Sequence, residues 1–227
     1  MKKTFIISLG GSLVVTQDGI NFEFLKKFRA LILGEIKKGT RFFLIVGGGA
    51  TARNYIQAAD KVIKVSDNDR DWLGIHSTRL NAHLLRTVFR DVAHPEIIKN
   101  PTIKLNTNKK IIVAGGWKPG WSTDYVAALI AQEYEVDTVI NLSNICCAYD
   151  KDPKKHMDAK KIMTINWPDF RKIVGNKWKP GLNMPFDPIA SQKAEKLGLK
   201  VFIANGEDLK NFKNILEGKK FKGTLIV

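Results

Sequence analysis

Residues 110–124 read KIIVAGGWKPGWSTD and contain an apolar run, a glycine-rich turn and the start of a helix. The four apolar residues at 111–114 predict a short buried strand, which two glycines stop. Residues 122–124, Ser-Thr-Asp, precede the run YVAALIAQ, whose apolar spacing predicts a helix. A strand, a glycine turn and a capped helix present backbone N–H groups to an anion at the edge of an α/β sheet. We therefore expect an anion-binding loop here.

Asp124 in this loop has two interpretations. It caps the helix, or it holds a ribose or a metal ion, and the stretch alone leaves both open. Three other stretches also place a glycine-rich or polar turn after an apolar run: GGS at 10–12, GGG at 47–49 and SN…YDKDPKK at 143–155. In open α/β sheets ligands bind outside the carboxyl ends of the strands. Four such loops therefore predict one site large enough for two phosphate-bearing ligands.

Strands and helices alternate along the chain. Apolar runs predict strands at residues 4–9, 41–46, 111–114, 137–142, 200–204 and 223–227. Helical spacing and capping residues predict helices at residues 22–38, 50–62, 69–92, 122–132, 167–174, 188–196 and 208–216, with a flexible segment at 175–183. This alternation predicts an α/β fold whose largely parallel sheet is covered on both faces.

The glycines at 47–49 and Arg53 form a second candidate phosphate site. Backbone without Cβ can approach a phosphate closely and can adopt conformations closed to other residues. Arg53 falls in the first turn of the following helix, where its guanidinium could fork onto a phosphate. The alternative is a glycine turn that serves packing and an arginine that is solvated.

The composition, with 44% apolar and 26% charged residues in 227, is that of an ordinary globular protein. This length suits one large α/β domain or two small lobes. No run approaches the ~18 apolar residues that span a bilayer. The start, MKKTFIISLGGSL, mimics a signal peptide, but its apolar stretch is only about six residues long and ends in glycines. We expect a first strand there and a cytoplasmic protein.

Positive charge is the unusual feature of the composition. Lysine and arginine number 37 against 22 acidic residues, which gives a net charge of +15. Such a surplus suits nucleic acid or polyanionic small molecules. The sequence has no basic stripe with interleaved aromatic residues and no nucleic-acid-binding motif, so we do not expect nucleic acid as the main partner.

The two cysteines, Cys146 and Cys147, are adjacent. A disulfide between neighbours is strained, and two thiols without nearby histidines make a poor metal site. We expect reduced, partly buried thiols.

Several common catalytic motifs are absent from the sequence. It has neither the P-loop pattern GxxxxGKS/T nor the Rossmann pattern GxGxxG, so neither a Walker-type kinase nor a dehydrogenase fits. No Ser-His-Asp or Cys-His arrangement is suggested either.

A set of motifs resembles the amino-acid kinase family, and within it the archaeal type of UMP kinase. The motifs are GGS near the start, VGGGxxARxYI, DxxGIxxTRLNA, GGxxPGxSTDxVAALIA, YDKDPKK, DPIA and a final GT. The resemblance implies a three-layer αβα sandwich formed by one domain, residues 1–227. Its acceptor-binding part would be roughly 1–135 and its ATP-binding part roughly 136–227. It also implies phosphoryl transfer from ATP with Mg²⁺ to UMP in pyrimidine nucleotide biosynthesis, and a homohexamer built from dimers.

The resemblance also assigns site residues, without any protein ligand for a metal. The residues implied at the ATP phosphates are Gly10, Gly11, Ser12, Gly49 and Arg53; among them Gly11, Ser12 and Arg53 are implied as catalytic. Those implied at the adenosine end are Ser143, Asn144, Tyr149 and Asp152. Those implied at UMP are Gly48, Asp71, Trp117, Lys118, Pro119, Gly120, Trp121, Ser122 and Thr123, with Asp124 next to them.

The sequence departs from the family pattern in three places. Cys146-Cys147 replaces an Asp-Gly turn, Trp117 stands where a threonine is usual, and Ala50 stands where some relatives have lysine. We expect the loop at Cys146 to be rebuilt, with at least one thiol packed as a small hydrophobe. Two alternative functions stay open: another small-molecule kinase of the same fold, and a non-catalytic, storage-type protein that binds nucleotides or oxyanions.

Overall fold

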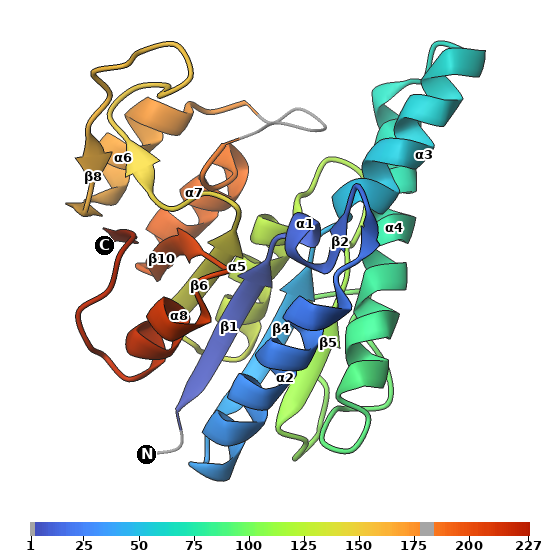
Figure 1. Cartoon of the computed structure of the whole chain (residues 1–227), viewed down its shortest axis with the longest axis vertical. Helices are drawn as coiled ribbons and strands as arrows, with labels where there is room; N and C mark the ends of the chain where they lie inside the picture. The colour runs from blue at the N-terminus through green and yellow to red at the C-terminus, as the bar shows by residue number, and fades with distance from the viewer. Residues whose placement is uncertain (1–2, 178–183) are drawn as a thin grey trace.

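A seven-stranded sheet forms the centre of the computed structural model, which describes residues 3–177 and 184–227 (Figure 1). In sheet order the strands are β5 (Ile111–Ala114), β4 (Arg41–Val46), β1 (Thr4–Leu9), β6 (Thr138–Ser143), β10 (Lys200–Asn205), β11 (Thr224–Ile226) and β9 (Thr164–Ile165). The first five are parallel, and β11 runs antiparallel to β10. The expected largely parallel sheet is confirmed.

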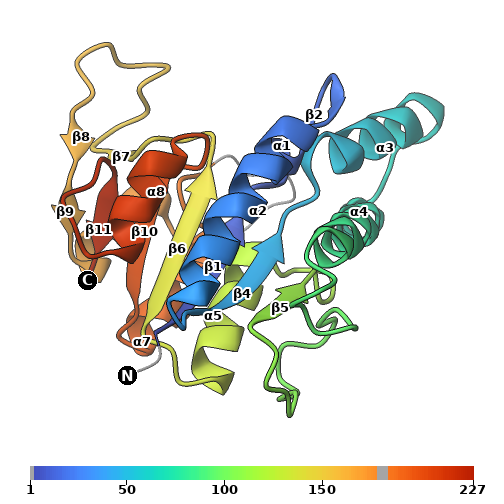
Figure 2. The ribbon, with the colours of Figure 1, turned by 60° about the horizontal axis from the view of Figure 1, so that its bottom comes forward.

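Helices cover both faces of this sheet. They are α1 (Gly11–Val14), α2 (Phe22–Lys37), α3 (Gly49–Val62), α4 (Asp67–Val88), α5 (Thr123–Glu133), α6 (Trp167–Val174), α7 (Pro188–Lys196) and α8 (Leu209–Leu216). Figure 2 shows α2 and α8 together on one side of the sheet. Residues of α2, α4 and α8 share one apolar core, and residues of α5, α6 and α7 share the other. The fold is therefore the three-layer αβα sandwich.

The two cores explain why the central strands are mainly apolar. Successive side chains of a strand point to opposite faces, so a strand covered on both sides buries the side chains of both faces. Ser8 of β1 and Asn141 of β6 are buried polar exceptions. In β1, Ile7 belongs to the core under α2, and its neighbour Ile6 belongs to the core under α5. Both side chains are fully buried.

Short polar side chains decide where the helices begin. Ser66, Ser122 and Asn166 each accept a hydrogen bond from a backbone N–H of the first turn of α4, α5 and α6. Asp187 caps α7 in the same way, and Pro188 occupies its first position. Proline fits there because its missing N–H would have no partner within the helix. The predicted helix positions are confirmed, with α4 starting two residues earlier and ending four earlier than expected.

The structure differs from the expectation after β1 and after β6. Gly11–Val14 form a short helix, α1, and a hairpin of β2 (Val15–Thr16) and β3 (Gly19–Ile20) follows, where we expected a simple turn. Leu13 and Val14 are almost completely buried, so packing supports this short helix. The loop after β6 contains β7 (Ala148–Tyr149), which pairs with β8 (Lys161–Ile162). Residues 178–183 of the expected flexible segment lie outside the described residues.

Helix α3 and the first turns of α4 extend away from the sheet (Figure 1). Only Ala50 of α3 is buried, and Tyr55, Val62 and the following Ile63 are exposed. No helix in the described ranges is both long and apolar enough to cross a bilayer.

Candidate functional site

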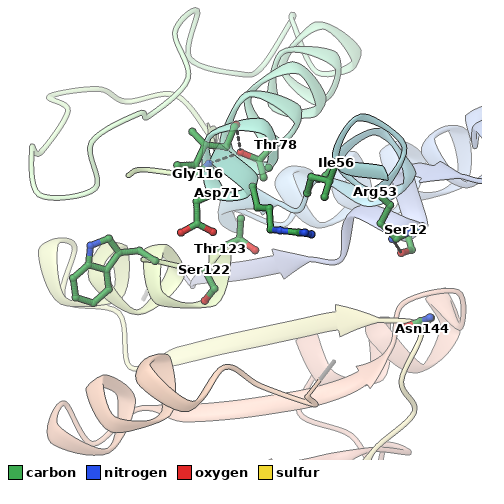
Figure 3. A pocket seen from close by; sticks show the side chains of 16 residues that line it. Ser12, Arg53, Ile56, Asp71, Thr78, Gly116, Ser122, Thr123 and Asn144 are labelled. Carbon is green, nitrogen blue, oxygen red and sulfur yellow. Dashed lines mark hydrogen bonds between the residues drawn. The ribbon is translucent and has the colours of Figure 1, made fainter. Parts of the chain in front are cut away.

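Four loops meet at the carboxyl ends of β5, β4, β1 and β6, as their parallel pairing requires. They border a cleft of about 620 Å³, a volume typical of small-ligand sites (Figure 3). Nine of the residues that we predicted for the site line it: Ser12, Gly48, Gly49, Arg53, Asp71, Trp121, Ser122, Thr123 and Asn144. The cleft therefore brings together residues that are up to 132 positions apart in the sequence, from Ser12 to Asn144.

The two N-terminal glycine loops pack directly on each other. A Cβ on Gly11 would overlap the backbone of Gly47 and Gly49, and a Cβ on Gly49 would overlap the carbonyl of Gly11. Gly49 also has a φ of +62°, which other residues rarely adopt. Packing between the loops thus requires these glycines. The same contact leaves their backbone at the edge of the cleft, because Gly48 and Gly49 both line it.

Arg53 and Ser12 come together across these two loops. The Arg53 Nη1 group donates a hydrogen bond of 3.3 Å to Ser12 Oγ, and both side chains face the cleft (Figure 3). Arg53 is exposed, and none of the ion pairs between described residues involves it. Its guanidinium is therefore available to an anionic ligand, next to the N-terminus of α3.

Helix α4 holds the loop that follows β5. The Gly116 N–H donates to Thr78 Oγ1 over 2.6 Å. Arg79 donates to the carbonyls of Gly116 and Trp117 over 3.1 and 2.8 Å. These bonds provide partners for backbone N–H and C=O groups of the loop that have no partner in a helix or strand.

The same helix also holds the glycine loop that follows β4. Asn81, which is buried, donates to the carbonyls of Gly47 and Gly48 over 2.9 and 3.0 Å. One helix thus sets the distance between the two loops, and the TRLNA motif supplies the side chains that do so.

Asp71 lies on α4 at the opposite side of the cleft from Asn144 (Figure 3). Its Oδ2 accepts a hydrogen bond of 2.7 Å from the Gly120 N–H. Partial burial raises the pKa of Asp71, the Gly120 bond opposes this rise, and repulsion from Asp67 adds to it. The carboxylate both anchors the β5–α5 loop and faces the cleft, where it can accept a bond from a hydroxyl.

Asp124 does not cap α5, so that interpretation is wrong. Ser122 is the cap and accepts from the Tyr125 N–H over 3.2 Å. Asp124 Oδ1 accepts from Ser8 Oγ over 2.7 Å and from Asn141 Nδ2 over 3.2 Å. Its carboxylate therefore ties α5 to β1 and β6 beneath the cleft, and it is not among the residues that line the cleft. Burial raises the pKa of Asp124, and the Ser8 bond opposes that rise.

A second carboxylate, Asp187, lies against Asp124. The Asp187 N–H donates to Asp124 Oδ2 over 3.2 Å, and Asp187 Oδ1 accepts from Ala190 N–H over 2.6 Å. Its other oxygen, Oδ2, is buried and has no hydrogen-bond partner in the described part of the chain. Burial, with repulsion from Asp124, raises the pKa of Asp187 to about 6, and the bond from the Ala190 N–H opposes this rise. The two acids thus form a buried pair without a cationic partner among the described residues.

The residues predicted for the adenosine end come from one loop, but only Asn144 lines the cleft. The Ser143 hydroxyl accepts from the Ile145 N–H, and the Asp152 carboxylate accepts from the Lys154 N–H. Tyr149 lies 3.6 Å from Cys146 through its hydroxyl. These side chains stabilise the shape of the loop around Asn144.

The two loop tryptophans have different positions. Trp121 lines the cleft and stacks on Tyr125 with ring centres 4.1 Å apart, whereas Trp117 is packed against the core under α5. Lys118 lies over the Trp117 ring at 4.2 Å. Gly10, Gly11, Trp117, Lys118, Pro119 and Gly120 are not among the lining residues.

Sequence reasoning missed the wall that α3 and α4 provide. Ala52 and Ile56 of α3, and Gly74, Ile75 and Thr78 of α4, line the cleft together with Arg70 and Gly116. Ala52 and Ile56 are four positions apart, and so are Arg70, Gly74 and Thr78 in turn, with Ile75 beside Gly74, so each set lies on one helical face. Extending the helical faces of Arg53 and Asp71 by one turn would have found Ile56, Gly74 and Ile75. Arg70 also pairs with Asp60 at 2.7 Å.

Comparisons with known proteins agree on one family. The family model described as "Amino acid kinase family" matches residues 3–205. A protein named uridylate kinase from Thermoplasma volcanium is 35% identical over 222 residues, which cover 96% of this chain and 95% of that protein. One of the same name from Methanospirillum hungatei is 34% identical, with 98% and 94% covered. The crystal structure of uridylate kinase from Archaeoglobus fulgidus matches with a TM-score of 0.80 and 29% identity over 100% of both chains.

Proposed function

Because this chain belongs to the amino acid kinase family, we propose that it transfers the γ-phosphoryl group of ATP to UMP, giving ADP and UDP. The observation that carries this proposal is the cleft itself. It joins Arg53, Ser12 and two glycines on one side to Asp71 and the β5–α5 loop on the other. The near full-length relatives named uridylate kinase indicate UMP as the acceptor.

The two sides of the cleft suit different ligands. We assign the ATP phosphates to Gly10, Gly11, Ser12, Gly49 and Arg53, and the adenosine end to Ser143, Asn144, Tyr149 and Asp152. We assign UMP to Gly48, Asp71 and the loop 117–123, with Asp124 beneath the cleft next to that loop. The acceptor part of the domain is then roughly 1–135 and the ATP part roughly 136–227.

Transfer of the phosphoryl group depends on positioning the two substrates and on stabilising negative charge, more than on a general base. The second pKa of a phosphate monoester is about 6, so the UMP phosphate is already largely ionised at neutral pH. Phosphoryl transfer then depends on bringing two polyanions into line and on stabilising the charge of the transferring group. Arg53, whose guanidinium donates to Ser12 Oγ, supplies a cation on the side that we assign to the ATP phosphates. The glycine loops supply backbone donors at the N-terminus of α3.

Magnesium fits this site as an ion carried by ATP. The described residues contain no group of three or more metal-binding side chains. Mg²⁺ is usually held by substrate phosphates with one or two carboxylates. Asp187, whose buried Oδ2 lacks a partner among the described residues, lies beside Asp124, but neither carboxylate lines the cleft, so the phosphates of ATP would hold the ion. When bound, the ion would neutralise phosphate charge.

The exposed apolar surface of α3 and α4 supports self-association. Tyr55, Val62, Trp72 and Leu80 are exposed on these two helices, where water contact is costly. We propose that a second copy of this chain covers them, as the first step toward a homohexamer built from dimers. We also propose a cytoplasmic enzyme of pyrimidine nucleotide biosynthesis.

A coupled assay of ADP release with Mg²⁺ and ATP tests the activity. The acceptors are UMP, CMP, carbamate, an acyl acceptor and an isoprenoid phosphate, and we expect the highest kcat/KM with UMP. Arg53→Gln, purified in parallel, reports contaminating kinase because Arg53 is exposed and its loss should not disturb folding. A higher kcat/KM with another acceptor would mean another small-molecule kinase. Nucleotide binding without any turnover would mean a storage-type protein.

A further inference from the structure

Cys146 and Cys147 form a contact pair in the loop that follows β6. Their Sγ atoms lie 2.9 Å apart, within hydrogen-bond distance and not bonded. Cys147 is buried and Cys146 is partly exposed. The chain has only these two cysteines. One accessible thiol is thus in contact with one protected thiol, and no other thiol of the same chain can compete with it.

The surroundings favour a thiolate on the accessible sulfur. Burial opposes ionisation of Cys146, but hydrogen bonds from Cys147 and Tyr149 and the positive charge of Lys161 outweigh it, so the pKa of Cys146 is lowered. Lys161 is paired with Tyr149 in the ladder of β7 and β8, which places its backbone beside the loop that carries the two cysteines. Burial and the neighbouring sulfur raise the pKa of Cys147 to about 11. A nucleophilic thiolate beside a thiol is the arrangement of a reactive cysteine and its resolving partner.

We propose that Cys146 and Cys147 are a reversible modification site, which a peroxide oxidises to an intramolecular disulfide that reshapes the nucleotide-binding loop. The Cys146 thiolate attacks one peroxide oxygen, forming an S–O bond and releasing hydroxide as the O–O bond breaks. The Cys147 sulfur then attacks the Cys146 sulfur, forming the S–S bond. The departing hydroxide takes the Cys147 proton as water. Two sulfurs each lose one electron, and the peroxide gains two.

Closing this bond strains the backbone. The two sulfurs must approach from 2.9 Å to about 2.05 Å. The peptide bond holds the two Cα atoms about 3.8 Å apart, closer than the usual distance of about 4.4–6.8 Å in a disulfide, so the torsions of the linking peptide must change. The loop is held on both sides of the pair, by the Ile145 N–H bond to Ser143 Oγ and by the Ala148 N–H bond to Thr224 Oγ1. The backbone between Ile145 and Ala148 must therefore rearrange. A strained disulfide of this kind is also easily reduced, which makes the change reversible.

The loop connects the pair to the candidate site. Asn144, two residues before Cys146, lines the cleft, and Tyr149, which contacts the Cys146 sulfur, follows it. If the adenosine end of ATP lies along this loop, which rests on the proposed function, oxidation weakens ATP binding and leaves UMP binding nearly unchanged. Asp71 and the β5–α5 loop are on the other side of the cleft.

Mass spectrometry of the intact protein tests the chemistry without any nucleotide. Hydrogen peroxide should lower the mass by about 2 Da, and a dithiol reductant should restore the original mass. A non-reducing gel should show only the monomeric chain, without cross-linked dimers. Cys147→Ser, which keeps Cys146, should react with peroxide faster than Cys146→Ser, which keeps Cys147. Oxygen addition to the wild type without loss of hydrogen, or cross-linked chains, would overturn the proposal. The mass of the oxidised wild-type protein tests disulfide formation even if a variant folds poorly.

Kinetics and binding then test the consequence. We expect the KM for ATP to rise about tenfold or more after oxidation and to recover after reduction, with the KM for UMP changed less than about twofold. Neither single variant should show a recoverable change of this size. If the disulfide forms but ATP binding is unchanged, the proposal that it reshapes the nucleotide-binding loop is wrong. If reduced protein shows no turnover with any acceptor, the proposed function fails, but the mass result and calorimetric ATP binding still judge this proposal.

Discussion

Replacing Asp187 with asparagine should stabilise the protein, and only above acidic pH. Asp187 is 7% exposed, and its pKa is raised from an ordinary 3.8 to about 6. Between these values the folded chain holds a proton that the unfolded chain has released, so stability falls as pH rises. A difference of about two in pKa corresponds to about 3 kcal/mol, which is lost between about pH 4 and 7.

Asparagine removes this loss and keeps the cap. Its Oδ1 can still accept from the Ala190 N–H, and its amide replaces the buried Oδ2 that lacks a partner among the described residues. The neutral amide also removes the repulsion between the Asp187 and Asp124 carboxylates. We therefore expect Asp187→Asn to be more stable than the wild type by up to about 3 kcal/mol at about pH 8. Near pH 4 the two proteins should be about equally stable.

Urea unfolding followed by tryptophan fluorescence at several pH values measures the difference. The matched control is Asp208→Asn, because Asp208 caps α8 through the Asn211 N–H in the same way but is exposed. Its effect on stability should be small. A difference between Asp187→Asn and the wild type that stays constant from about pH 4 to 8 would refute the reasoning, as would a less stable variant at about pH 8.

Three further predictions concern the cleft. Asp71→Ala should raise the KM for UMP by about ten- to a hundredfold and leave ATP binding nearly intact, because a charge-assisted hydrogen bond contributes ~1.5–3 kcal/mol; an unchanged KM in steady-state kinetics would remove Asp71 from the acceptor site. Arg53→Lys should lower kcat with little change in stability, since a point charge does not reproduce a fork on a phosphate; wild-type turnover would make Arg53 a solvated residue. Thr78→Val should leave the buried Gly116 N–H without its acceptor, which costs about 1–3 kcal/mol of stability and raises the KM for UMP; if Thr78→Ser fails to restore both, the hydroxyl is not what holds the loop.

The sequence by itself determined the elements and their order. Strands buried on both faces are mainly apolar, and caps such as Ser122 and Asp187 mark helix starts, so both signals are local. The glycine runs at 10–11 and 47–49 identified two of the loops at the cleft. Local chemistry suffices there because a turn or a cap depends on a few neighbouring residues.

Only the tertiary structure decided what several of these residues do. Asp124 is bonded to Ser8, 116 positions away, and this distant partner is why it supports the sheet and does not cap α5. Gly11 is required by the backbone of Gly49, a contact between two loops. The cleft wall on α3 and α4 likewise depends on which helical face turns toward the loops. Contacts between distant segments depend on how the layers pack, and no local spacing in the sequence encodes that packing.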